Sequence, residues 1–146
     1  MIAFKQFFVE KNILGLEEDI DVDGIGKIKA KLDTGNGAFN VLHGEDLETD
    51  GNLVRFTTVN GFRVEKPLED TITINLGAGN KEQRPICLFD CSIGGITFKN
   101  TPFSIGNRSD NEHKVLIGKD FIKNELDALI DVGLVNVAHD RLNTNI

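Results

Sequence analysis

The chain contains many short runs in which apolar and polar residues alternate, and most of these runs end at a glycine or asparagine turn. This pattern restricts the chain to a mostly β fold. Lysines alternate with apolar residues from Ile25 to Leu32, and Thr71 to Leu76 alternates in the same way. Asn60-Gly61 separates two further strand-like runs, as in a two-residue hairpin, and Gly94-Gly95 turns the run of residues 85–93 back into the run of residues 96–105. Residues 119–130 alone have apolar side chains near helical spacing, which predicts one short C-terminal helix.

The length of 146 residues and the absence of a linker, repeat or low-complexity segment predict a single domain over residues 1–146. Residues 132–137 are expected to form a final strand, and the polar residues 139–146 a frayed tail. The expected architecture is a closed or strongly coiled β-barrel.

Charge and composition exclude some partners. The formal net charge is -7 without any Lys/Arg-rich block, which argues against nucleic acid or an anionic membrane as the main partner. No apolar run approaches the ~20 residues that span a bilayer, and residues 1–10 lack the features of a signal peptide, so a cytoplasmic protein is expected. Cys87 and Cys91 would lie about 13 Å apart along a strand, too far for a disulfide. Reduced thiols fit the same compartment.

A carboxylate on a glycine turn is the candidate catalytic feature. Asp33-Thr34-Gly35 closes one strand-like run, and Val115 to Gly118, including Ile117, is a later apolar run that we expect to pack beside it. Gly35 lets the backbone turn so that its N–H reaches the carboxylate, and the Thr34 hydroxyl can bond a partner loop. Three residues recur by chance, so the triad alone also fits an ordinary strand-end turn.

Peptide hydrolysis by carboxylates needs two of them. Two carboxylates about 3 Å apart share one proton, so that one activates water and the other polarises the carbonyl. The chain has a single Asp-Thr-Gly triad, which predicts a symmetric homodimer with Asp33 of each chain on the axis.

Longer stretches resemble a branch of the retropepsin-like aspartic peptidases, the family catalogued as ATP-dependent zinc proteases and often found near ATP-grasp peptide ligases. The stretches that carry the resemblance are Ala30 to Gly35, Leu42-His43-Gly44, Val54-Arg55-Phe56, Arg84-Pro85-Ile86, Phe103 to Ser109 and His113 to Ile122. The resemblance covers roughly residues 10–135. It implies a retropepsin-like fold, a water nucleophile, no cofactor, and a peptide or protein substrate. The family's association with ATP-grasp ligases suggests that the bonds cleaved are isopeptide or oligo-glutamate bonds, and it implies a functional link to such a ligase.

The chain departs from the family pattern at the turn itself. Asn36 stands where alanine is usual, and its amide is expected to donate to Asp33 and lower the pKa of that carboxyl. Phe39-Asn40 replaces a Thr-Ser pair, and Lys119 replaces an arginine after Gly118, which weakens any bidentate contact there.

A glycine-rich hairpin is the candidate flap over the substrate. Gly77, Ala78, Gly79 and Asn80 lie between two strand-like runs, so residues 71–86 are predicted to form the lid. An ordinary exposed hairpin is the alternative, and the Asn60-Gly61 hairpin is a rival flap. Arg84 would bind an acidic substrate group or an internal carboxylate.

The family name implies zinc, but the sequence offers no metal site. There is no H-E-x-x-H, and His43, His113 and His139 are scattered. No glycine loop followed by Lys-Ser/Thr indicates ATP binding. We therefore expect an aspartic peptidase that uses neither metal nor cofactor. A catalytically inactive peptide-binding or assembly module of the same fold is the main alternative, and a metal-dependent hydrolase is a third.

Overall fold

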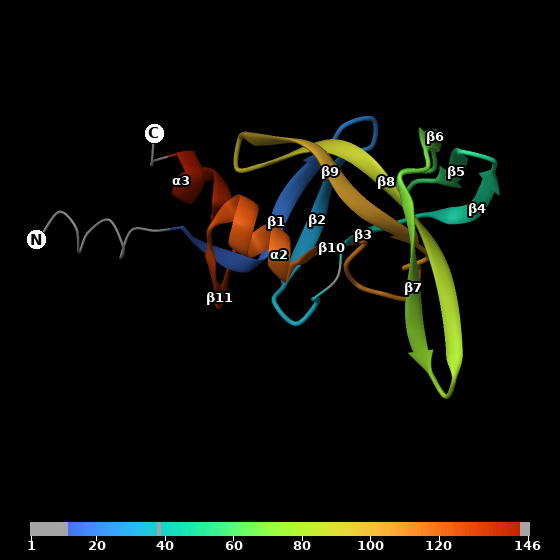
Figure 1. The fold of residues 1–146 in the computed structure, drawn as a ribbon. Helices are drawn as coiled ribbons and strands as arrows, with labels where there is room; N and C mark the ends of the chain where they lie inside the picture. The colour runs from blue at the N-terminus through green and yellow to red at the C-terminus, as the bar shows by residue number, and fades with distance from the viewer. Residues whose placement is uncertain (1–11, 38, 144–146) are drawn as a thin grey trace, which may run out of the picture.

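Two sheets form the body of the molecule in the computed structural model, which describes residues 12–37 and 39–143 (Figure 1). The elements in these ranges are β1 (Ile13–Val22), β2 (Gly26–Asp33), β3 (Asn40–His43), β4 (Glu45–Asp50), β5 (Leu53–Thr57), β6 (Arg63–Pro67), β7 (Asp70–Gly77), β8 (Asn80–Ile93), β9 (Ile96–Gly106), β10 (Val115–Gly118), α2 (Lys119–Phe121), the π-helix η1 (Ile122–Leu126), β11 (Leu129–Val135) and α3 (Ala138–Asn143). The fold is thus mostly β, as the sequence predicts.

The larger sheet has eight strands in the order β11-β1-β2-β10-β3-β9-β8-β7. The long strand β1 also pairs with β8, from Ile20 opposite Ile93 to Val22 opposite Cys91, so the sheet bends back on itself. β4, β5 and β6 form a separate three-stranded sheet. β11 is parallel to β1, and β10 is parallel to β2, so residues far apart in the chain are neighbours in the sheet.

The inward side chains of the alternating strands form the core. Phe89 packs edge to face on both Phe56 and Phe103, with ring centroids 6.4 and 5.8 Å apart. The chain has ten Phe but no Trp or Tyr, so these contacts supply aromatic packing without a polar group to satisfy. Cys87 and Cys91 are both free and buried, in accord with the expected reduced thiols.

The predicted hairpins are confirmed, although the loop that contains Asn60-Gly61 spans residues 58–62 and not two residues. Asn60-Gly61 lies in the turn between β5 and β6, Gly94-Gly95 joins β8 to β9, and residues 77–80 contain the tip between β7 and β8. In the last of these turns Gly77, Ala78 and Gly79 all have positive φ, of 87°, 50° and 80°.

The predicted helix over 119–130 is wrong at its C-terminal end. Helical structure begins at Lys119 as expected but ends at Leu126, because Asp127 adopts a left-handed conformation with φ of 49°. Leu129 and Ile130 instead begin β11, which pairs with β1. The apolar spacing of this segment suits either structure, and pairing with β1 decides it.

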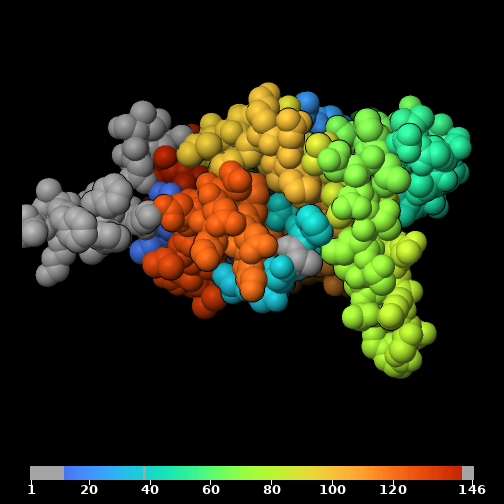
Figure 2. Space-filling model, viewed as in Figure 1, coloured from blue at the N-terminus to red at the C-terminus, as the bar shows by residue number. Residues whose placement is uncertain are grey.

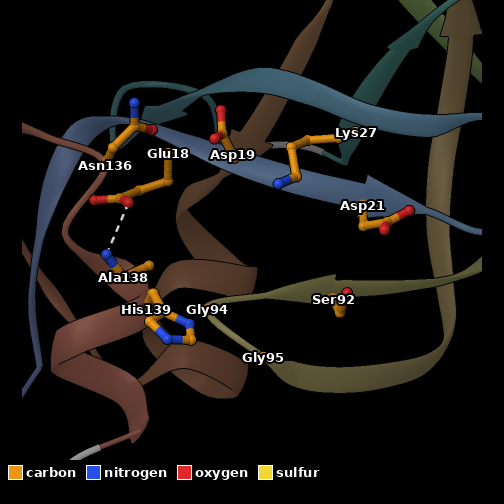
Figure 3. Close-up of a pocket in the computed structure, with 10 residues that line it drawn as sticks. All are labelled: Glu18, Asp19, Asp21, Lys27, Ser92, Gly94, Gly95, Asn136, Ala138 and His139. Carbon is orange, nitrogen blue, oxygen red and sulfur yellow. Dashed lines mark hydrogen bonds between the residues drawn. The ribbon is translucent and has the colours of Figure 1, made fainter.

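The predicted frayed tail is also wrong where the structure describes it, since Ala138–Asn143 form the short helix α3 with Leu142 buried. The reason is Glu18, whose carboxylate is 1% exposed and accepts N–H groups of Gly15, Val137 and Ala138 at 2.7, 3.2 and 2.9 Å. Figure 3 shows the contact with Ala138. Residues 144–146 of the predicted tail lie outside the described residues.

Candidate functional site

Asp33 is the last residue of β2, and the strand arrangement fixes its surroundings. β10 runs between β2 and β3, the two strands that the Asp33 loop connects. Leu32 pairs with Ile117 and Asp33 with Gly118 in the parallel β2–β10 ladder. The expectation that the Val115–Gly118 run packs beside the Asp33 strand is therefore confirmed.

Backbone donors orient the Asp33 carboxylate. The Gly35 N–H donates to Asp33 Oδ1 at 3.0 Å, and the Asn36 N–H donates to the Asp33 carbonyl at 3.1 Å. Asp33 is half-buried, whereas Thr34 and Gly35 are exposed. A side chain at Gly35 would place its Cβ 3.3 Å from Oδ1, so glycine leaves the carboxylate room to lie close over the turn.

The loop that follows is fastened to the end of β10. The Lys119 N–H donates to the Asn36 carbonyl at 2.9 Å. The buried side chain of Asn40 accepts the Gly118 N–H on Oδ1 at 2.8 Å. The Asn36 amide donates to the Phe39 carbonyl at 3.2 Å, whereas the sequence predicted a bond to the Asp33 carboxylate. These bonds hold the Asp33 turn from both sides.

The hairpin β7–β8 projects from the body as an arm (Figures 1 and 2). Its free end is the tip Gly77-Ala78-Gly79-Asn80, and a Cβ added at Gly77 or Gly79 would meet no atom within 4 Å. Ile72 pairs with Arg84 and Ile74 with Glu82, so apolar and charged groups share one face of the arm.

Arg84 binds an internal carboxylate, which is one of its two predicted roles. Its guanidinium lies 2.8–2.9 Å from Glu82 Oε2 and covers Gly106, where an added Cβ would approach it to 2.8 Å. The arm is therefore packed onto β9 at its base.

Arg108 is the residue that sequence reasoning missed. Burial and the charge of Arg84 lower the pKa of Arg108, and the negative charge of Asp33 opposes this shift. The charges of Arg84 and Asp33 therefore both act on the Arg108 guanidinium. The signal was present, because Arg108-Ser109 belongs to a motif stretch, but the motif does not show what the side chain faces.

A cavity of about 690 Å³ adjoins the turn, lined by Thr34, Lys119, Ile122 and Leu129 among others. Among the described residues, no group of three or more His, Cys, Asp or Glu side chains is arranged to hold a metal ion. In the same part of the chain, no helix has the length and apolar character needed to cross a membrane.

The sequence matches no protein-family model, and the search of curated proteins found no match. A solved structure is similar in fold, the Legionella pneumophila subsp. pneumophila str. Philadelphia 1 protein Lpg0085, described as a protein of unknown function (DUF785). The TM-score is 0.70 at 23% sequence identity, over 87% of this chain and 98% of that chain. This similarity establishes a shared fold.

Proposed function

We propose that the protein is a retropepsin-like aspartic peptidase that works as a homodimer. The observation that carries the proposal is the Asp33 turn. The half-buried Asp33 carboxylate accepts the Gly35 N–H, and residue Asp33 pairs with Gly118 in the β2–β10 ladder. The β1–β8 pairing, which bends the sheet back on itself, supports the closed β-barrel of such a peptidase.

The chemistry follows from bringing two Asp33 carboxylates together. Close together they hold one proton between them, so the ionised carboxylate takes a proton from water while the protonated one donates to the substrate carbonyl. Water is the nucleophile, and the leaving amine recovers a proton from the pair. Thr34 and Gly35 maintain the turn in each chain, and Asn36, Ile117 and Gly118 support it.

An exposed apolar edge supports the dimer. β11 is an edge strand, and its side chains Leu129, Val132 and Val135 are 69%, 74% and 58% exposed. Leu129 lines the same cavity as Thr34, so a second copy on this edge would lie next to the Asp33 turn. Dimerisation and completion of the dyad would then be one event.

The β7–β8 arm is the proposed flap, because it is a hairpin with an unpacked glycine tip and a base held by Arg84. Arg108, on which the charges of Asp33 and Arg84 both act, favours a substrate with a carboxylate, such as an oligo-glutamate or isopeptide tail. The net charge of -7 disfavours binding of a long acidic substrate. We therefore favour recognition of a single carboxylate next to the bond that is cleaved.

The decisive experiment combines mass and cleavage. Light scattering after gel filtration, with refractive-index detection because Trp and Tyr are absent, should give a dimer for wild type and Asp33→Asn. A peptide library that includes oligo-glutamate tails should be cleaved by wild type and not by Asp33→Asn. A strict monomer at high concentration would refute the shared dyad.

The alternative function is a binding or assembly module of the same fold. The Phe39-Asn40 departure from the family pattern beside the turn favours it. Peptide binding that survives Asp33→Asn, without cleavage by wild type, would establish this alternative. Val132→Asp, at the exposed edge, should yield monomers and abolish cleavage if the peptidase proposal is right.

A further inference from the structure

A second cavity, of about 300 Å³, lies beside the segment that leads from the Asp33 turn into β3. The walls come from three parts of the chain: the start of β3 and the residue before it, the strand β9, and the helical segment of α2 and η1. The residues that the argument uses are Phe39, Asn40, Pro102, Asp120, Phe121 and Glu125. Asp120 also lines the larger cavity next to Thr34.

The side chain of Asn40 has a fixed orientation and a donor without a partner. Asn40 is 4% exposed, and its side chain accepts the Gly118 N–H at 2.8 Å. A backbone N–H can only donate, so the accepting atom is Oδ1 and the other end of the amide is the NH₂ group. No atom of residues 12–37 or 39–143 accepts a hydrogen bond from Asn40 Nδ2.

The free NH₂ group of Asn40 opens to the cavity. Within the described ranges, every fully buried side-chain nitrogen or oxygen has a hydrogen-bond partner, so Nδ2 is not sealed in the core. Asn40 lines the cavity, which is where its NH₂ group is reached. A nearly buried donor that lacks an acceptor costs free energy. A ligand oxygen at the inner end of the cavity would remove this cost.

Aromatic rings form the apolar walls. Phe121 is 8% exposed and packs edge to face on Phe98, with ring centroids 5.0 Å apart, so this wall is held in place by the core. Phe39 is 38% exposed and Pro102 is half-buried. Rings of this kind pack favourably on another aromatic ring. The walls therefore suit a ligand with an aromatic body.

The charges at the cavity select against an anion. Asp120 and Glu125 line it and are both exposed. One cation lies near, since a Cβ added at Gly37 would be 3.6 Å from Lys119 Nζ. Two carboxylates against one ammonium leave negative charge in excess, which favours a positive group at the rim and a neutral oxygen at the inner end.

We propose that this cavity binds a tyrosine side chain of a peptide in which basic residues flank the tyrosine. The phenol oxygen accepts from Asn40 Nδ2, the ring packs against Phe39 and Phe121, and a flanking lysine or arginine pairs with Asp120 or Glu125. Tyrosine is the side chain that combines an aromatic body with a neutral terminal oxygen.

The cavity is a feature of this chain, because Phe39 and Asn40 are the two residues that replace the Thr-Ser pair of the family pattern. Binding there does not require hydrolysis, so the proposal holds for a peptidase and for a binding module alike.

The first test is a titration followed by NMR of the side-chain amides. The acetylated and amidated tripeptide Lys-Tyr-Lys should shift the Asn40 NH₂ resonances saturably. Lys-Phe-Lys, which lacks the oxygen, should bind about five- to tenfold more weakly, the effect of one hydrogen bond. Glu-Tyr-Glu should bind about two- to fivefold more weakly, as expected for exposed charges. Equal binding of the Tyr and Phe peptides, or a cavity that holds water only, would overturn the proposal.

The second test uses variants of the protein. Phe39→Ala should weaken binding of Lys-Tyr-Lys several-fold, and the matched variant Phe62→Ala, at a position 63% exposed in the β5–β6 loop, should not. Asn40→Ala should abolish the preference for Tyr over Phe; if this variant does not fold, the Asn40 resonances of wild type decide. Unchanged binding in Phe39→Ala would refute the site.

The peptidase proposal is tested separately. Asp33→Asn should bind Lys-Tyr-Lys as tightly as wild type does, because Asp33 does not line the cavity. If wild type cleaves no peptide, the peptidase function fails and the titration still decides whether the cavity is a tyrosine site.

Discussion

Replacing Glu18 by glutamine tests how strongly one buried carboxylate holds the C-terminal segment. The three N–H donors of Gly15, Val137 and Ala138 all point at its two oxygens. An amide has only one oxygen, so its NH₂ group must oppose at least one N–H donor. Hydrogen bonds to a charged group are worth about 1.5–3 kcal/mol, and those to a neutral group about 1 kcal/mol.

The substitution removes one hydrogen bond and weakens two, which lowers the free energy of unfolding. The smaller desolvation cost of the neutral amide offsets part of this loss. We expect Glu18→Gln to lower the free energy of unfolding by about 2–4 kcal/mol. Asp21→Asn, an exposed position on the same strand, should change it by less than about 0.5 kcal/mol. Urea titration followed by circular dichroism is the assay, because no Trp or Tyr gives fluorescence. A loss below about 1 kcal/mol would refute this accounting of the hydrogen bonds.

Three further predictions concern the core, the thiols and pH. Gly44→Ala should destabilise the protein by about 1–3 kcal/mol in the same assay, because the added Cβ would lie 2.5 Å from Ile105 and 2.7 Å from Phe56; an unchanged midpoint would contradict this packing. Burial raises the pKa of the Cys87 thiol to about 11 and also raises the pKa of Cys91, so iodoacetamide at pH 8 should label both only when urea unfolds the protein. Three groups have folded-state pKa values below their ordinary values: burial lowers that of His43, the His113 hydrogen bond that of Glu17, and the Asn100 N–H that of Asp90. Their contribution to the stability of the folded protein is therefore complete above pH 6.5 and is lost as pH falls through the lowered values. Urea midpoints that stay constant from pH 7 to about pH 4 would exclude this linkage.

Local chemistry made the turns and the main strands predictable. Asn60-Gly61 and Gly94-Gly95 specify their hairpins through residues that tolerate positive φ, as Gly61, Gly94 and Gly95 do. The packing of the Val115–Gly118 run beside the Asp33 strand was also expected, from two apolar runs in a fixed order. These features depend on a few adjacent residues, so a sequence displays them directly.

Long-range partners account for what the sequence did not predict. α3 forms where Glu18, from the first described strand, accepts its first N–H groups, and nothing near residue 138 indicates this. The backbone of Arg108 is held by His43, which accepts its N–H, and by Lys114, which donates to its carbonyl. In both cases a polar side chain from a distant strand replaces a local signal, and local patterns cannot identify the partner.

The position of β10 has a consequence for how the chain acquires its site. β10 must lie between β2 and β3, although those strands precede it by more than a third of the chain. During synthesis the Asp33 turn therefore lacks its neighbouring strand β10 until residue 118 has left the ribosome. β1 can pair with β11 only later still. Such non-local pairings fold slowly because the intervening loop must close first. A nascent chain thus has an unfinished carboxylate turn until β10 has paired with β2.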